Sequence, residues 1–453
     1  MGDESLTFLG AAGTVTGSKF LLRSAATSVL VDAGLFQGLK ALRRRNWGPL
    51  GFPAPELDAV VVSHAHLDHC GYLPALVRQG FNGPILLTEQ TAQLAEIVLR
   101  DSAKLQEEDA RYAASRGFSR HSHPKPLYDA DDVARTLPLF RVVEFGAEVK
   151  VGDIPVRLER AGHILGSASP KVGPVLFSGD LGRPSHRLLR PPAPPQAANT
   201  IVVESTYGDR AHPADPTEAL VDAINRAVDR GGSVVIPAFA VDRTEVLLLA
   251  LQDLMTAARI PTLPVFIDSP MALRALEVYR EGLVSAPDVR PDLPEDVFDW
   301  PQLRVAASAG ESEALNDPAR PCIMLSASGM ATGGRVLHHL RAMLPDPRHA
   351  VILVGYQAVG TRGRDLASGA SAVKIHGEYV PVRAEVVDVQ GWSVHADADE
   401  LLRWLGSAPE PPDVVYVVHG EPAASATLAA RIGAELGWLA IVPRDGERVR
   451  IRP

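Results

Sequence analysis

The sequence predicts an α/β protein, in which a sandwich of two β-sheets with outer helices is interrupted by an inserted α/β domain with a mainly parallel sheet. Two patterns support this prediction. Strand ends that carry His or Asp recur in residues 1–208 and return in residues 380–453, whereas residues 209–379 alternate between strands and helices. We therefore expect the first and last segments to fold together and the middle segment to form a separate domain.

The composition is that of an ordinary globular protein, with 46% hydrophobic and 22% charged residues in a chain of 453. No apolar run approaches the roughly 18 to 20 residues that span a bilayer, and the N-terminus is acidic where a secretory signal would be basic. Two cysteines, Cys70 and Cys322, are too few for a disulfide framework. These features predict a cytoplasmic protein with no membrane partner. The net charge of −9 argues against general adhesion to polyanions but leaves a local basic groove open.

Residues 6–32 have the pattern of three short strands joined by turns rich in Gly and Thr. The third strand ends in Asp32, which is followed by Ala33 and Gly34. A carboxylate at such a strand end can accept a hydrogen bond from a metal-binding imidazole and fix its tautomer. The alternative is an Asp that caps a turn.

The stretch from Val60 to Gly71 follows a buried β-branched run and contains four metal-ligand residues within six positions. Because residues two apart in an extended segment point the same way, His64 and His66 can bind one ion. If a helix begins near Asp68, then Asp68 and His69 leave in another direction and can reach a second ion about 3.5–4 Å from the first. A His-rich surface turn is the alternative.

Residues 89–116 show helical periodicity, and the pair His121 and His123 follows in a run of Ser and Pro that we interpret as a solvated loop. Strands then resume. His163 stands between glycines at a strand terminus, and Asp180 ends another buried strand. Strand ends that meet at one edge of a sandwich can assemble a site, because they face the same way.

The proline-rich run at 191–195 predicts a stiff linker, and the strand after it ends in Glu204. Beyond about residue 209 the strands alternate with helices, as expected for an open parallel sheet. His395 and His419 each lie at or just after a strand end beyond this region. The last candidate ligands are therefore expected to return to the first domain.

Assembled in this way, the residues resemble the motifs of the metallo-β-lactamase superfamily, whose fold is an αββα sandwich. The positions that carry this resemblance are Asp32, His64, His66, Asp68, His69, His163 and Asp180. Three more positions resemble the additional motifs of the β-CASP nucleases, which carry an inserted domain, namely Glu204, His395 and His419. The similarity is greatest to the branch that includes the endonuclease subunit of the cleavage and polyadenylation machinery.

This resemblance implies two Zn²⁺ per chain, a metal that imidazole and carboxylate ligands suit. The ligands of one ion would be His64, His66 and His163. Those of the other would be Asp68, His69 and His419, with Asp180 bridging the two.

The resemblance also implies a ribonuclease that hydrolyses phosphodiester bonds of single-stranded RNA in RNA processing or decay. A hydroxide between the metals would attack in line, and Asp68 would help to orient it. His395, which the Glu204 carboxylate would keep protonated, would supply a proton to the leaving 3′ oxygen. Family members often form dimers, so the resemblance also allows a homodimer.

The inserted domain is expected to help bind the RNA. Its glycine-rich loop from strand to helix offers hydroxyls and backbone N–H groups to a phosphate, at Ser326, Ser328, Gly329 and Thr332. The resemblance adds a phosphate contact by Arg243, although Asp242 stands where family members often have Gly.

Two other functions are compatible with the sequence. A small-molecule ester or thioester hydrolase of the same superfamily would share the stretch from His64 to His69, but it has no use for such a large insert. A catalytically inactive scaffold subunit of an RNA-processing complex is the second, although such paralogues lose ligands and every ligand position is filled here. Whether cleavage is internal or proceeds from the 5′ end also stays open.

Overall fold

The computed structural model describes residues 4–116, 124–213, 216–389 and 391–452. The chain forms two compact units. The first combines Met1–Ala211 with His395–Pro453, and the second contains His212–Val394. No helix among the described residues is long and apolar enough to cross a membrane.

The first sheet of the first unit has seven strands in the order β22-β1-β2-β3-β4-β5-β6. Its strands are β1(Ser5–Phe8), β2(Phe20–Arg23), β3(Ser28–Val31), β4(Ala59–Val61), β5(Ile85–Leu87), β6(Phe140–Val142) and β22(Arg448–Arg450). Pairing is antiparallel from β22 to β3 and parallel from β3 to β6. The chain segments that follow β3 and β4 therefore leave the sheet at the same edge.

The second sheet also has seven strands, in the order β21-β20-β11-β10-β9-β8-β7. Its strands are β7(Glu148–Val151), β8(Ile154–Arg160), β9(Ala168–Val172), β10(Val175–Phe177), β11(Thr200–Val203), β20(Val414–Val417) and β21(Ala440–Ile441). The four strands from β10 to β21 are parallel. The inner faces of both sheets meet in one apolar core, where Phe20 packs on Phe177 and Phe8 packs on Tyr416.

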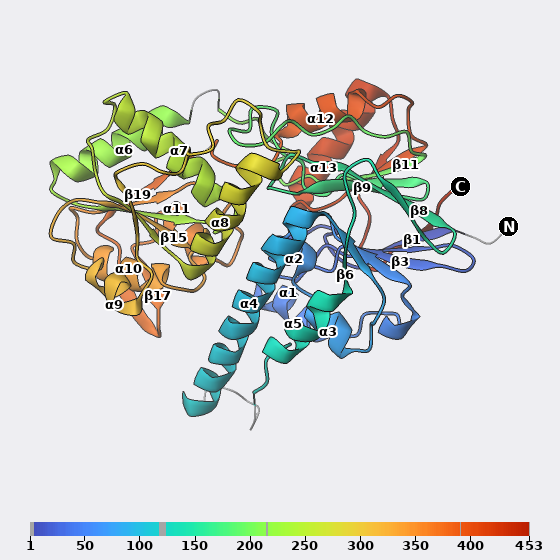
Figure 1. Cartoon of the computed structure of the whole chain (residues 1–453), viewed down its shortest axis with the longest axis horizontal. Coiled ribbons are helices and arrows are strands. Elements are labelled where there is room, and N and C mark those ends of the chain that lie inside the picture. Colours follow the sequence, from blue (N-terminus) through green and yellow to red (C-terminus); the bar gives the residue numbers. More distant parts are fainter. Residues whose placement is uncertain (1–3, 117–123, 214–215, 390, 453) are drawn as a thin grey trace. The chain divides into compact units, whose positions relative to one another are not determined.

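Helices cover both outer faces of this sandwich, so the unit has the predicted αββα layers (Figure 1). On the side of the first sheet lie α1(Lys40–Arg45), α2(Leu67–Cys70), α3(Leu73–Arg78), α4(Glu89–Arg116) and α5(Ala130–Thr136). On the side of the second sheet lie α12(Ala398–Gly406) and α13(Pro422–Arg431), whose apolar residues pack on β11 and β20. Short helical turns complete this unit, namely η1(Ala54–Glu56), η2(Leu137–Leu139) and η3(Ile432–Leu436).

The second unit is built on a six-stranded sheet in which every pairing is parallel, as the alternating pattern predicted. In sheet order its strands are β14(Leu303–Val305), β13(Val265–Asp268), β15(Ile323–Ala327), β12(Val234–Ala238), β16(Ala350–Leu353) and β19(Glu385–Asp388). Its helices are α6(Thr217–Asp229), α7(Arg243–Thr256), α8(Pro270–Ser285), α9(Ala309–Ala314), α10(Val336–Met343) and α11(Arg362–Ala367). A separate hairpin consists of β17(Ala372–Ile375) and β18(Glu378–Pro381).

The end of this unit differs from the predicted boundary at residue 379. The unit continues to Val394, because β19 pairs in parallel with β16 and extends the six-stranded sheet. A hairpin precedes β19 where the alternating pattern would have a helix, and the strand itself is only partly buried. The sequence around β19 therefore gives little sign that the parallel sheet continues. The first boundary, predicted after residue 208, lies after Ala211 in the structure.

Candidate metal centre

The stretch with four predicted ligands occupies the turn between β4 and α2. His64 is fully buried just beyond the strand, and His66 keeps an extended backbone at the start of the helix. Asp68 and His69 lie on α2 itself, so their side chains leave the backbone from a helix and not from the extended segment. The helix required for the two pairs to point in different directions is therefore present.

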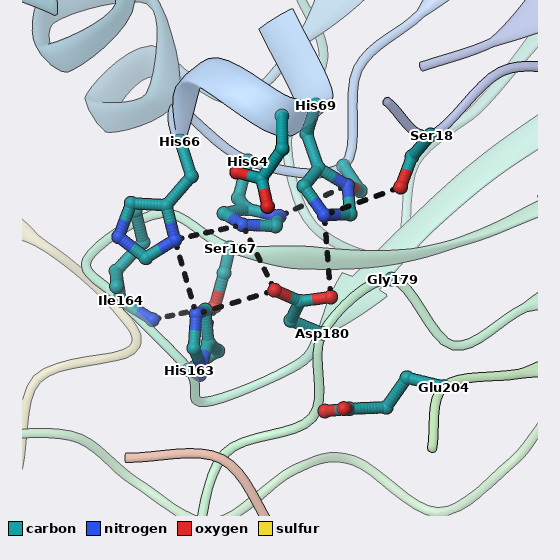
Figure 2. A network of polar contacts seen from close by, with 12 residues as sticks. Ser18, His64, His66, His69, His163, Ile164, Ser167, Gly179, Asp180 and Glu204 are labelled. Carbon is teal, nitrogen blue, oxygen red and sulfur yellow. Dashed lines mark hydrogen bonds and ion pairs between the residues drawn. The ribbon is translucent and has the colours of Figure 1, made fainter. Parts of the chain in front are cut away.

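The first cluster brings together three imidazoles and a carboxylate (Figure 2). His66 Nδ1 lies 3.1 Å from His64 Nε2 and 3.3 Å from His163 Nε2. Asp180 Oδ2 lies 3.4 Å from His64 Nε2 and 3.6 Å from His163 Nε2. Burial lowers the pKa of His64 and His163 well below the ordinary value and lowers the pKa of His66 to about 4. These imidazoles are therefore neutral at pH 7, as metal ligands must be.

The second cluster lies on the other side of Asp180. His69 Nε2 is 3.2 Å from His419 Nε2, which is 3.5 Å from Asp68 Oδ2. Asp180 Oδ1 is 3.3 Å from His69 Nε2 and 3.5 Å from His419 Nδ1. Burial disfavours a charged His69, but the Asp180 and Asp32 carboxylates outweigh this effect and raise its pKa well above the ordinary value. A cation at this position would replace that proton.

These donors fit a pair of metal ions. Ligand atoms within 4.8 Å of one another occur in both clusters, and Asp180 presents one carboxylate oxygen to each. Asp180 Oδ1 is buried and, among the described residues, has no hydrogen-bond donor, so a buried negative charge faces the second cluster. Imidazole and carboxylate donors of this kind suit zinc and similar divalent metals.

Asp32 lies on the side of the His69 ring that faces away from the second cluster. Its Oδ2 lies 2.7 Å from His69 Nδ1, which leaves Nε2 to face the second cluster. Asp32 also accepts hydrogen bonds from the backbone N–H and the hydroxyl of Ser63 at 2.7 and 2.9 Å. The Ser63 hydroxyl in turn lies 3.0 Å from His64 Nδ1. One carboxylate therefore orients ligands of both clusters.

Two hydroxyls that orient ligands were not among the predicted site residues. Ser63 is the first, and Thr206 is the second, since its Oγ1 lies 3.1 Å from His419 Nδ1 and donates to the His419 carbonyl at 3.2 Å. The only sequence signal for either residue is its position, one residue before His64 and two residues after Glu204.

A third group joins Glu204 and His395 to Asp180. His395 Nδ1 lies 3.2 and 3.3 Å from the two Glu204 oxygens and 3.9 Å from Asp180 Oδ2. Glu204 is 1% exposed, and its oxygens accept hydrogen bonds from the N–H groups of Leu181 and Thr206 at 2.8 and 3.2 Å. Backbone N–H groups therefore hold the Glu204 carboxylate in position, and this carboxylate orients the His395 imidazole.

The predicted phosphate-binding residues of the second unit fall into two groups. Ser326 is buried and donates to the Asp268 carbonyl at 3.0 Å, and Arg243 is buried and donates to the Val354 carbonyl. In contrast, Thr332 is exposed and Ser328 is half-buried, with their hydroxyl oxygens 3.0 Å apart.

Two neighbouring positions explain part of this local structure. Gly329 packs so closely on Phe239 that a Cβ would lie 2.8 Å from the ring. Asp242 has a φ of 69°, in the region that favours glycine. Glycine adopts this backbone conformation without strain, whereas Asp242 does not. His121 and His123 lie outside the described residues.

Lys19 stabilises the loop beneath the second cluster. It is 3% exposed, its ammonium donates to the Gly34 carbonyl, and it lies 4.7 and 4.8 Å from the ring centroids of Phe36 and Tyr72. Burial lowers its pKa to about 7, with a smaller effect from Arg45. The folded state therefore binds fewer protons than the unfolded state above pH 7.

We expect Lys19 to make the free energy of unfolding rise between pH 7 and pH 9 by about 2 kcal/mol, because one pKa unit corresponds to about 1.4 kcal/mol. The sign follows from a folded pKa near 7 and an unfolded pKa near 10.5. Urea unfolding at pH 7, 8 and 9 should show this rise in the wild type and a flatter profile in Lys19→Met. Identical profiles in the two proteins would contradict the assignment.

The αββα sandwich and the two converging ligand clusters place the protein in the metallo-β-lactamase superfamily of metal-dependent proteins. The family model described as the metallo-beta-lactamase superfamily matches residues 13–238. A second family model, described as the Beta-Casp domain, matches residues 244–366. A third, described as the Zn-dependent metallo-hydrolase RNA specificity domain, matches residues 379–443. This last match begins at the predicted boundary, whereas the compact second unit extends to Val394.

Ribonuclease TTHA0252 of Thermus thermophilus is 38% identical to the chain, over 91% of this chain and 92% of that protein. Transcription termination factor FttA of Methanocaldococcus jannaschii is 28% identical, over 99% of this chain and 72% of that protein. An RNase J-like protein of the same organism is 30% identical, over 86% of this chain and 88% of that protein. A solved structure from Enterococcus faecalis, of unknown function, shares the fold at a TM-score of 0.52 and 14% identity, over 99% of this chain and 100% of that chain. The chain belongs to the β-CASP family of the metallo-β-lactamase superfamily, which confirms the predicted family and fold class.

Proposed function

We propose that this protein is a zinc-dependent ribonuclease that hydrolyses phosphodiester bonds of single-stranded RNA. The observation that carries the proposal is the position of Asp180, with one oxygen toward each of two ligand clusters and the His395 imidazole beside it. The relatives named as ribonucleases support RNA as the substrate. Their similarity extends over most of both chains.

The residues present would hold two ions. His64, His66 and His163 would bind one, Asp68, His69 and His419 the other, and Asp180 would bind both. When bound, such ions lower the pKa of a water molecule and withdraw charge from phosphate oxygens. The protein contributes the orientation of these ligands, through Asp32, Ser63 and Thr206.

His395 is the group that we assign to the leaving 3′ oxygen. Nδ1 faces the Glu204 carboxylate, and we assign Nε2 as the nitrogen that donates a proton toward the substrate. A neighbouring carboxylate stabilises the protonated imidazole, and the backbone N–H groups that bind Glu204 keep this pair in position. Asp68 is 19% exposed at its side chain, which allows it to contact the attacking water.

In the second unit we assign phosphate contacts to Ser328 and Thr332, whose hydroxyls lie together near the surface. Ser326 and Arg243 then support the loop from inside, through the Asp268 and Val354 carbonyls, and Gly329 allows its close packing.

The two other functions fit less well. A small-molecule hydrolase does not require the inserted sheet or the Glu204 and His395 pair. An inactive scaffold does not require converging buried ligands, whose desolvation costs free energy when no cation compensates it.

The decisive experiment uses an RNA labelled at either end, incubated with the purified protein with and without a chelator. We expect metal analysis to find about two zinc ions per chain, and we expect the chelator to abolish cleavage, because the proposed activation of water depends on the bound cations. The two labels separate internal cleavage from digestion that starts at the 5′ end. RNA degradation that persists in the metal-free protein would refute the proposal.

A further inference from the structure

A strongly basic surface lies outside the metal centre. Between Asp32 and Glu56 the chain has no acidic residue, although its net charge is −9. The four basic residues in this interval all lie on α1, and no residue of that helix is buried. They are Lys40, Arg43, Arg44 and Arg45. Trp47 follows directly, and 62% of it is exposed.

The helix is held firmly at its C-terminal end. The Asn46 side chain accepts from the Phe36 N–H and donates to the Phe36 carbonyl, both at 2.9 Å. The Arg45 guanidinium lies 3.9 Å from the Phe36 ring centroid and pairs with Asp445. Arg45 therefore attaches α1 to the rest of the first unit. The other basic side chains of α1 extend from a helix whose C-terminal end is held in place.

The free charges of this surface are Lys40 and Arg44. Both are exposed, and neither forms an ion pair or side-chain hydrogen bond with any residue that the structure describes. Arg43 interacts with Asp109: burial raises the pKa of this carboxyl group, and the Arg43 charge opposes the rise. Two cations and one indole thus remain available to a partner.

This surface is connected to the metal centre by a short rigid segment. The N–H of Ala33 donates to the His69 carbonyl at 2.7 Å, and the N–H of Leu35 donates to the Leu67 carbonyl at 2.8 Å. Lys40 lies eight positions after Asp32 in the sequence. An extended chain of that length spans at most about 29 Å. A nucleic-acid strand of several nucleotides could therefore reach from the centre to α1.

We propose that α1 and Trp47 form a second binding surface for single-stranded RNA, on which Lys40 and Arg44 bind backbone phosphates and the Trp47 indole stacks on a base. This proposal rests on the proposed function for the identity of the nucleic acid. Free cations beside an exposed aromatic ring are the combination that binds single strands without sequence preference. The exposed apolar side chains beside these charges are Leu39 and Trp47, a small apolar area for a stable protein interface.

The test measures binding of the metal-loaded protein to an oligouridylate of about 20 nucleotides with phosphorothioate linkages, which slow its hydrolysis. Fluorescence anisotropy between about 50 and 200 mM salt gives Kd and its salt dependence. The variants are Lys40→Gln with Arg44→Gln, and Trp47→Ala. The matched control is Lys150→Gln with Arg157→Gln, which removes the same charge from exposed positions on β7 and β8.

We expect the Lys40 and Arg44 variant to raise Kd about tenfold and to reduce the salt slope by about 1.4, which corresponds to about 0.7 for each lost phosphate contact. Trp47→Ala should raise Kd about 5- to 100-fold with little change in slope. The control should bind like the wild type.

If the α1 variants and the control bind the oligouridylate with equal affinity, the proposal is overturned. The same result is expected if this surface binds a protein and not RNA. The proposed function fails separately, if the wild type does not cleave RNA or if cleavage persists in the metal-free protein. A wild type that binds RNA through α1 without cleaving it would support this surface and refute the nuclease.

Discussion

Replacing His395 with alanine is expected to lower kcat for RNA cleavage by about 10²- to 10⁴-fold, the usual contribution of a positioned general acid. The metal content should stay at the wild-type level, because the three imidazoles and the Asp180 oxygen of the nearest cluster converge without His395. KM should change little, since the lost interaction is made only in the transition state. Metal analysis and steady-state kinetics on the same preparation test both statements.

Glu204→Gln removes the negative charge of the Glu204 side chain but keeps its size and shape, so it tests the effect of the charge on His395. The amide can retain one hydrogen bond to His395 Nδ1, but it no longer stabilises the protonated imidazole. We therefore expect the alkaline limb of the kcat profile to move to lower pH in this variant. His338→Ala, which removes an exposed imidazole on α10, is the matched control and should leave kcat unchanged.

Loss of zinc from the His395→Ala variant would show that the His395 imidazole is a ligand and not a proton donor.

The sequence predicted those features that depend on local pattern. The helix of residues 89–116 has the expected bounds, since its apolar positions repeat at helical spacing over many turns. The different directions of His64 and Asp68 required a helix to begin near Asp68, and α2 begins at Leu67. Strand ends face one edge in any such sandwich, so recurrent His and Asp at those ends indicated a common site.

Features set by distant neighbours could not be predicted. Ser326 and Arg243 are buried and donate hydrogen bonds to carbonyls that are 58 and 111 residues away in the sequence. A local sequence pattern cannot predict such contacts. The roles of Ser63 and Thr206 depend on the exact approach of an imidazole to a hydroxyl. A buried hydroxyl near a strand end has no distinctive sequence signal, so these residues emerge only from the folded chain.

Asp180→Asn is expected to deplete both metals, whereas His419→Ala should deplete only one. Asp180 is the residue that presents an oxygen to each cluster, and its negative charge compensates the burial of two cations among imidazoles. The amide keeps the size but removes that charge, so we expect an affinity loss of more than about 100-fold at both sites, beyond the 10- to 100-fold typical of outer contacts. Of the predicted ligands, His419 lies next to His69, Asp68 and Asp180 Oδ1, so its loss should leave the first cluster intact.

Metal analysis after dialysis against buffered free zinc distinguishes these outcomes. We expect close to two ions per chain in the wild type, about one in His419→Ala, and well under one in Asp180→Asn. Asp413→Asn, an exposed position before β20, is the control for the change from carboxylate to amide. If Asp180→Asn retained both ions, the two clusters would be independent sites, since neither would need the shared charge. Depletion of both ions by His419→Ala would instead mean that the clusters fill cooperatively and that the second site controls the first.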